Sequence, residues 1–391
     1  MSLKNKYNLF YFIFCIVGCC MAGFVAVFLQ FKGISNTMIG VVTGAGCVSS
    51  IVLSPYLSSL IIRYEKLNAR NMLTGIYSLL AVVFAVIAFV PLPPVLIVAG
   101  YTVMYALYVG SASFPQVIAS DYIQEGRDIN FGLARGLGSS SWAITALVMG
   151  PAIDFFSPLV LARGFILSTV CMLLLIRSMP AAESVQEEKE TGKSTVFSII
   201  RNYRIYFMVL VGYSFCLGAH SCLGTYLPNI ISRLGGSTGI YGVAVFMMAL
   251  SEMPVMAMAA KWMKKVDSLT LIAVGGFAYV IRNFTICMAN NIPMVIVGLL
   301  FQSVSYGLLT AVITYYVIYN LAPADQVMGQ AMIGIMSSGF GATIGNMAGG
   351  VLLDNMGIGS MFVFSCVLTA IGFAVIVAAK LADAKAKKAT V

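Results

Sequence analysis

Charged side chains are scarce in this chain: of its 391 residues, 9% are Asp, Glu, Lys or Arg, while 60% are hydrophobic. A soluble domain of this size needs far more polar surface to face water, so the composition excludes that class and predicts a membrane protein. The first 31 residues carry two lysines and then a long apolar run without a small-residue cleavage site. They therefore predict a first membrane-spanning helix and not a removed signal peptide.

Residues that bind metals or carry out nucleophilic chemistry are also few. The chain has one histidine, and its nine cysteines form no CxxC pair and all lie in predicted helices. These residues support neither a zinc site nor a disulfide framework, so no metal and no cofactor is expected. No Gly-rich phosphate loop, ATP motif or nucleophile–base pair is present, which disfavours a membrane-embedded enzyme or a receptor. A sensor built from membrane-spanning helices stays open.

Positive charge is in excess, with a formal net charge of +9, and its distribution is asymmetric. Of the 23 Lys and Arg residues, 18 fall in the two termini and in every second loop. Only Lys32, Arg163 and Arg233 fall on the other side. This asymmetry follows the positive-inside rule and predicts a multi-pass protein of the cytoplasmic (inner) membrane with both termini in the cytoplasm. The basic surplus thus predicts orientation in a lipid bilayer, and no nucleic-acid partner is expected.

Long apolar segments recur twelve times, and each is long enough to cross a hydrocarbon core of about 30 Å. The predicted spans are 7–31, 36–62, 71–91, 94–119, 131–153, 159–179, 203–232, 238–262, 268–289, 292–320, 328–353 and 357–380. One long polar interruption, residues 181–201, contains the run EEKE and splits the spans six and six. The sequence therefore predicts an all-α membrane protein with an N-terminal six-helix bundle (1–180), a cytoplasmic linker (181–201) and a C-terminal six-helix bundle (202–391).

The two halves also share short motifs at equivalent places, which indicates an internal duplication with pseudo-symmetric bundles. The pairs are Asp128-x-x-x-Gly132 with Asp325-x-x-x-Gly329, and Gly150-x-x-x-Asp154 with Gly350-x-x-x-Asp354. In the eleventh span, Gly341, Gly345 and Gly349 form a small-residue stripe that predicts close helix contact.

Only three charged residues lie in the middle of a long apolar segment: Arg135, Glu252 and Arg282. A charge at the bilayer centre costs about 2.5–3.5 kcal/mol on insertion scales, so such residues normally face a water-filled cavity or one another. They are the first candidates for a substrate or proton path.

The stretch Phe131-Gly-Leu-Ala-Arg135-Gly-Leu-Gly138-Ser-Ser-Ser-Trp142 resembles the FGRARxxGxxGW motif of the lactose-permease branch of the major facilitator superfamily. That branch includes phenylpropionate-permease-like proteins and nucleoside–proton symporters. Glu252 and Arg282 also stand where lactose permease has a functional glutamate and arginine. The resemblance implies a monomeric symporter in which one bundle rocks against the other around a small-molecule substrate, with the proton as coupling ion.

Four residues take a role from this resemblance. Arg135 matches the arginine that binds sugar hydroxyls, and its guanidinium offers five fixed donors. Trp142 matches the tryptophan that stacks on a galactosyl ring, and an indole face suits any flat apolar face. Glu252 matches the acid shared between the sugar and proton sites, and Arg282 the arginine that assists proton release. A buried glutamate near an arginine is a group whose protonation can change between states.

Five further residues are predicted to line the substrate site, because helices one, four, seven and ten line the cavity in the superfamily that the chain resembles. They are Tyr105, Gln116, His220, Gln302 and Ser305. The chain also departs from the family pattern. Leu308 replaces the tenth-helix glutamate that releases the proton, which puts conventional proton coupling in doubt and makes a uniporter the alternative.

A sugar or glycoside is the expected cargo, with a nucleoside close behind. An organic anion is the rival within transport, because Arg135 lacks the fourth-helix acid that partners its counterpart in lactose permease. Drug efflux is a third alternative. No enzymatic activity is expected.

Overall fold

The computed structural model describes residues 1–64, 67–180 and 195–389, and helices are the regular elements of all three ranges. Up to the predicted linker, the elements are α1 (Leu3–Gly18), η1 (Cys19–Gly23), α2 (Val25–Phe31), α3 (Asn36–Arg63), α4 (Ala69–Phe89), α5 (Pro94–Gly110), α6 (Phe114–Gln124), α7 (Phe131–Phe155) and α8 (Leu159–Ser178). The three η elements of the chain are π-helical turns set within longer helices.

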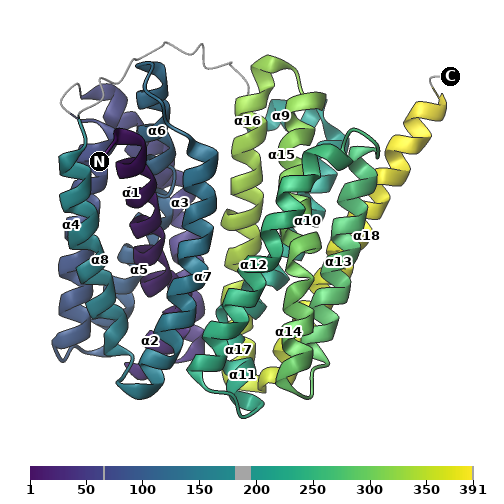
Figure 1. Cartoon of the computed structure of the whole chain (residues 1–391). Coiled ribbons are helices and arrows are strands. Elements are labelled where there is room, and N and C mark those ends of the chain that lie inside the picture. Colours follow the sequence, from purple (N-terminus) through teal and green to yellow (C-terminus); the bar gives the residue numbers. More distant parts are fainter. Residues whose placement is uncertain (65–66, 181–194, 390–391) are drawn as a thin grey trace. The chain divides into compact units, whose positions relative to one another are not determined.

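After the predicted linker, the elements are α9 (Val196–Asn202), α10 (Arg204–Thr225), α11 (Leu227–Arg233), α12 (Thr238–Trp262), α13 (Ser268–Cys287), α14 (Ile292–Leu300), η2 (Ser303–Leu308), α15 (Leu309–Asn320), α16 (Pro323–Gly334), η3 (Ile335–Gly341), α17 (Ala342–Met356) and α18 (Ile358–Ala389). Figure 1 colours them from teal through green to yellow.

Contacts divide the chain into two compact units. The first comprises Met1–Glu187 with Gly235–Phe246, and the second Glu188–Leu234 with Met247–Val391. Residues 181–194 of the predicted linker lie outside the described residues, whereas its last part forms most of the short helix α9. The predicted domain boundaries stay a prediction.

Each of the twelve predicted spans contains helix in the described chain. Ten helical stretches are long and apolar enough to cross a membrane by length and composition. The two remaining spans correspond to α7 and α12, which are helices of 25 residues each. The predicted span 94–119 lies within one candidate membrane span, Pro94–Gln124, but the helix breaks inside it, between α5 and α6 after Gly110. Pro115 explains where the new helix begins, since proline fits the first turn of a helix and not its interior.

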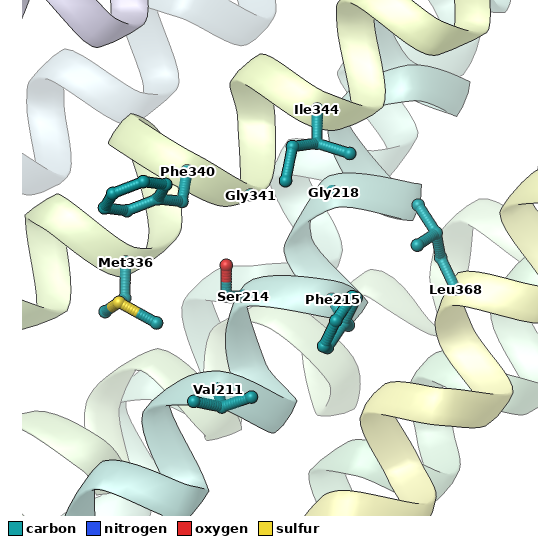
Figure 2. Close-up of a pocket in the computed structure, with 9 residues that line it drawn as sticks. All are labelled: Val211, Ser214, Phe215, Gly218, Met336, Phe340, Gly341, Ile344 and Leu368. Atoms are coloured by element: carbon teal, nitrogen blue, oxygen red, sulfur yellow. The ribbon is translucent and has the colours of Figure 1, made fainter.

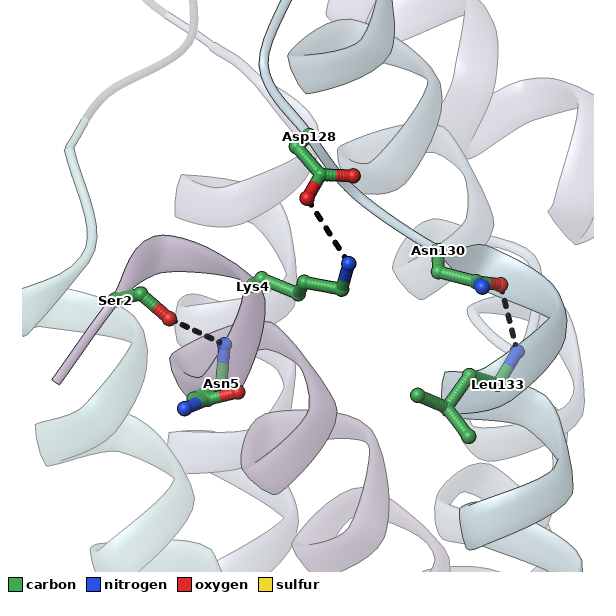
Figure 3. A network of polar contacts seen from close by, with 6 residues as sticks. All are labelled: Ser2, Lys4, Asn5, Asp128, Asn130 and Leu133. Carbon is green, nitrogen blue, oxygen red and sulfur yellow. Dashed lines mark hydrogen bonds and ion pairs between the residues drawn. The ribbon is translucent and has the colours of Figure 1, made fainter.

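The entrance to α7 is fixed by polar contacts in the first unit (Figure 3). The Asn130 side chain caps α7 by accepting a hydrogen bond from the backbone N–H of Leu133 at 3.0 Å. Lys4 on α1 forms an ion pair of 2.9 Å with Asp128, just before that cap. Such a cap typically contributes about 1 kcal/mol. The cap sets where α7 starts and therefore places Arg135 about one turn inside it.

An aromatic core holds the first unit together around Phe84 of α4. Its ring lies 4.9 Å from Phe28, 5.0 Å from Phe165 and 5.8 Å from Tyr101, each edge-to-face. This geometry is the favourable one for aromatic pairs. The Tyr101 hydroxyl donates to the backbone carbonyl of Met21 at 2.8 Å, so this tyrosine is a packing residue.

Glycines bring the helices of the second unit into close contact. A Cβ added at Gly212 of α10 would lie 2.7 Å from the carbonyl oxygen of Gly372 on α18. On another side of α10, Gly341, Gly345 and Gly349 pack against Ser214, Gly218 and Cys222 in turn. The predicted close contact of this glycine stripe is confirmed.

Candidate functional site

Arg282 of α13 is held by a chain of buried hydrogen bonds in the second unit. Its Nη1 donates to Oδ1 of Asn283 at 2.7 Å, and Nδ2 of Asn283 donates to Oγ1 of Thr369 on α18 at 2.7 Å. The Thr369 hydroxyl donates in turn to the carbonyl of Ser365 at 2.7 Å. Because that hydroxyl has only one hydrogen, it must accept from Asn283, which directs the amide oxygen of Asn283 towards Arg282.

Glu252 of α12 lies half-buried in the same unit. Its carboxyl group is hydrogen-bonded to the Gln302 side chain and close enough to Arg282 for the two charges to interact. Glu252 and Arg282 do not form an ion pair within 4.0 Å. The ion pairs in the described part of the chain are Lys4–Asp128, Arg127–Glu125 and Lys387–Asp383. Arg282 instead takes Asn283 as its hydrogen-bond acceptor.

His220 of α10 is enclosed by aromatic rings. Its imidazole stacks on Tyr306 of η2, with ring centroids 5.4 Å apart and planes 7° from parallel. The edge of Tyr279 approaches the imidazole at 6.0 Å. The charge of Arg282 also acts on His220 and on Tyr279, so these side chains form one cluster with the arginine.

The cluster contains buried polar atoms that have no hydrogen-bond partner among the described residues. They are Nδ1 of His220, the hydroxyl of Tyr279, Nε of Arg282 and Oε1 of Gln302; the buried Oγ of Ser305, the residue before Tyr306 on η2, also has no partner there. Buried polar groups in proteins are nearly always paired with protein or ordered water. Donors and acceptors are both represented, so a polar, uncharged ligand or a group of waters matches this set.

The first unit carries the other predicted site residues on α7. Arg135 is exposed, and its charge acts on Tyr11 of α1, whose ring packs against Gly138. Trp142 lies two turns further on and is half-buried. A Cβ added at Gly23 of η1 would lie 3.2 Å from the Trp142 ring, so this glycine makes room for the indole.

The remaining predicted residues of the first unit are less closely associated with Trp142. Tyr105 is half-buried, and its ring packs against Gly46 of α3, where an added Cβ would lie 2.7 Å from it. Gln116 is exposed on α6. The Tyr108 hydroxyl lies beside Gly18, which also contacts the Trp142 ring. Tyr108, one turn after Tyr105 on α5, thus lies next to the tryptophan.

Sequence reasoning missed Tyr279, Asn283 and Thr369. Asn283 directly follows Arg282, so its place beside a buried charge was the one sequence signal that could have identified it as a site residue. Tyr279 and Thr369 join the cluster only through contacts between α10, α13 and α18, which no local pattern predicts.

A separate cavity of about 180 Å³ lies between α10, η3 with α17, and α18 (Figure 2). Ser214 is the one side chain with a hydroxyl among the residues that line it. The others are Val211, Phe215, Gly218, Met336, Phe340, Gly341, Ile344 and Leu368. Such a lining does not match a polar solute, so the polar cluster is the candidate site and this cavity is not.

Long apolar helices, with charged and polar groups buried among them, define a polytopic membrane protein. The chain belongs to the MFS_1 like family, whose model matches residues 4–364. The predicted superfamily is therefore confirmed, and with it the predicted fold class.

Two curated relatives align over part of their length. The chain is 22% identical to the uncharacterized transporter YwbF of Bacillus subtilis (strain 168), over 66% of this chain and 63% of that protein. It is 24% identical to a maltose permease of Geobacillus stearothermophilus, over 63% of this chain and 62% of the relative. The chain thus spans less than two thirds of the length of these relatives.

Solved structures show the same fold over nearly the whole chain. A point mutant of the nucleoside transporter NupG superposes with a TM-score of 0.83 at 13% identity, covering 97% of this chain and 99% of that one. NupG itself gives a TM-score of 0.80 at 15% identity, with the same coverage. At these identities the likeness shows the fold alone.

Proposed function

We propose that this protein is a secondary active transporter that moves a small, polar, uncharged solute across the cytoplasmic membrane by alternating access. A sugar, a glycoside or a nucleoside has the required chemistry. Family membership supports transport, and both termini are proposed to lie in the cytoplasm because the Lys and Arg residues concentrate on that side.

The observation that carries the proposal is the set of unpartnered buried atoms in the second unit. Hydroxyl, imidazole, amide and guanidinium groups together offer donors and acceptors in several directions. A solute with several hydroxyl groups satisfies such a set, whereas an apolar drug would leave these atoms unpaired at a cost of about 1–3 kcal/mol each. In the first unit, Arg135 and Trp142 are proposed solute contacts, through hydrogen bonds and ring stacking respectively.

Glu252 is the proposed proton-carrying group. It shares hydrogen bonding with Gln302 and interacts with the charge of Arg282, so a change in its protonation alters contacts inside the polar cluster. This connection between the carboxyl group and the cluster supports coupling of a proton to the solute. A uniporter is the alternative, since Leu308 stands in place of the second acid.

The experiment is a thermal-shift screen of the purified protein against sugars, glycosides, nucleosides and carboxylates, followed by uptake assays in proteoliposomes. Ser305→Ala removes one unpartnered buried hydroxyl of η2 and should weaken binding of the identified solute by about threefold to tenfold, the value of one hydrogen bond. Thr169→Val is the matched control, because Thr169 also has a buried unpartnered hydroxyl but lies on α8, outside the cluster. Equal effects of the two substitutions would contradict the proposed site.

An organic anion is the second candidate. Arg282 forms no ion pair with an acid among the described residues, and the exposed Arg135 likewise forms none. Stabilisation by carboxylates, with none by sugars or nucleosides, would favour this reading.

A further inference from the structure

A polar pocket lies at the junction of α9 and α10, remote from the cluster around Arg282. It has a volume of about 550 Å³ and is lined from α9 and α10 by residues 201–206, from α15 by Tyr316 and Asn320, and from α18 by Asp383. All of these residues belong to the second unit. Figure 1 shows α9 and the C-terminal end of α18 at the same end of this unit. We call it the α9–α10 pocket.

The walls of the pocket are held by specific contacts. Tyr206 is 1% exposed, donates its hydroxyl to the carbonyl of Gly329 at 2.8 Å, and stacks on Tyr316 with centroids 5.9 Å apart. The Tyr203 hydroxyl donates to Oδ2 of Asp325 at 2.8 Å and accepts from the backbone N–H of Ala322 at 3.1 Å. The short segment that carries Arg201 and Arg204 is therefore anchored to α16.

The pocket carries net positive charge. Arg201 and Arg204 both line it, both are exposed, and neither has a carboxylate partner among the described residues. Asp383 is the acid in the lining, but it forms an ion pair of 2.7 Å with Lys387, which offsets its charge. No side chain caps α10, so the backbone N–H groups of its first turn add to the positive potential beside Arg204.

We propose that the α9–α10 pocket binds a phosphate ester through Arg201 and Arg204. A guanidinium matches a phosphate group with two parallel hydrogen bonds, and charge-assisted bonds of this kind are among the strongest that proteins form. The side chains of Asn202 and Asn320 supply further amide donors at the rim. The phosphate ester belongs to either a phospholipid headgroup or a soluble metabolite. This site is independent of the transport site, so either proposal stands or fails alone.

The test is native mass spectrometry of the full-length protein in detergent, titrated with phosphatidylglycerol, phosphatidylethanolamine or a phosphate-free diacyl glycolipid. The double substitution Arg201→Gln, Arg204→Gln should weaken binding of phosphatidylglycerol by about tenfold or more, which is the value of at least one charge-assisted hydrogen bond. The control is Lys264→Gln with Lys265→Gln, which removes the same charge from exposed positions outside the pocket. The control should bind within about twofold of the wild type, because surface charges away from the site contribute little.

Two further arms identify the source of the phosphate. Displacement of the phospholipid by millimolar inorganic phosphate or glycerol 3-phosphate supports a soluble ester, and retention supports a lipid headgroup. Arg201→Lys with Arg204→Lys keeps the charge and should retain part of the affinity. If the Arg201→Gln, Arg204→Gln variant binds the phospholipid as tightly as the Lys264→Gln, Lys265→Gln control, the proposal is overturned. Binding of the glycolipid as tightly as the phospholipids would overturn it as well.

Discussion

A close crossing of α10 and α18 in the second unit provides a test with a control inside one helix. Gly212 and Gly224 both lie in α10, so replacing either with alanine favours the helix, by about 1 kcal/mol at the interior Gly212 and by less at Gly224 in the last turn. Their surroundings differ. A Cβ at Gly212 would lie 2.7 Å from the carbonyl oxygen of Gly372 and 3.1 Å from the backbone nitrogen of Ile376, whereas a Cβ at Gly224 meets nothing within 4 Å.

The expected cost follows from that geometry. Ordinary contact begins at 3.4 Å, so Gly212→Ala requires α10 and α18 to separate by up to 0.7 Å at a backbone atom that cannot rotate away. Overpacking of this kind costs about 1–3 kcal/mol. Because helix propensity favours alanine at both positions, and more so at Gly212, a lower stability of Gly212→Ala than of Gly224→Ala has to come from the overpacking.

The assay is the apparent melting temperature of each purified variant in the same detergent. At about 2–4 °C per kcal/mol, Gly212→Ala should melt about 2–12 °C below Gly224→Ala. Gly224→Ala should melt at or slightly above the wild type. If Gly212→Ala is as stable as Gly224→Ala, the close crossing of α10 and α18 is not a determinant of stability, and the reasoning fails.

Four other substitutions test the sites. Glu252→Gln should abolish accumulation driven by a pH gradient in proteoliposomes and leave solute exchange measurable; uphill accumulation that persists would make Glu252 a structural residue. Trp142→Ala should lose most of the affinity for a ring-shaped solute in a binding assay, and Trp142→Phe should keep part of it; unchanged binding by the alanine variant would exclude stacking. Arg135→Lys should severely impair uptake of a neutral solute, since the planar fork of donors is lost, but should leave substantial uptake of a carboxylate. Thr369→Val should lower the melting temperature through a loss of about 1–3 kcal/mol, because Asn283 loses its acceptor, whereas Thr369→Ser should not; equal melting temperatures of these two variants would contradict the hydrogen-bond chain.

The positions of the membrane-spanning helices could be predicted from sequence because apolar length alone determines them. The break after Gly110 was missed, since the residues on both sides of it are apolar and only Pro115 marks the new start. The π-helical turn that carries Ser305 and Tyr306 has no sequence signature of its own. It changes which residues of the tenth span share a face.

The candidate site was only partly predictable for a related reason. The cost of burying a charge singles out Glu252 and Arg282 in any apolar segment. The partner of Arg282 could not be derived in the same way. Asn283 can accept from Arg282 only because its amide nitrogen donates to Thr369, more than eighty residues later. That contact depends on how α13 packs against α18.

Asp128 and Asp325, which begin the matching motifs of the two halves, both attach a helix end. Asp128 holds the first helix of the chain through the ammonium group of Lys4, and Asp325 holds the segment before α10 through the hydroxyl of Tyr203. The acceptor is an aspartate in both halves, while the donor is a cation in the first and a neutral phenol in the second. The exposed ion pair between Lys4 and Asp128 is weakened by salt, so ionic strength should loosen the attachment of α1 more than that of the segment before α10.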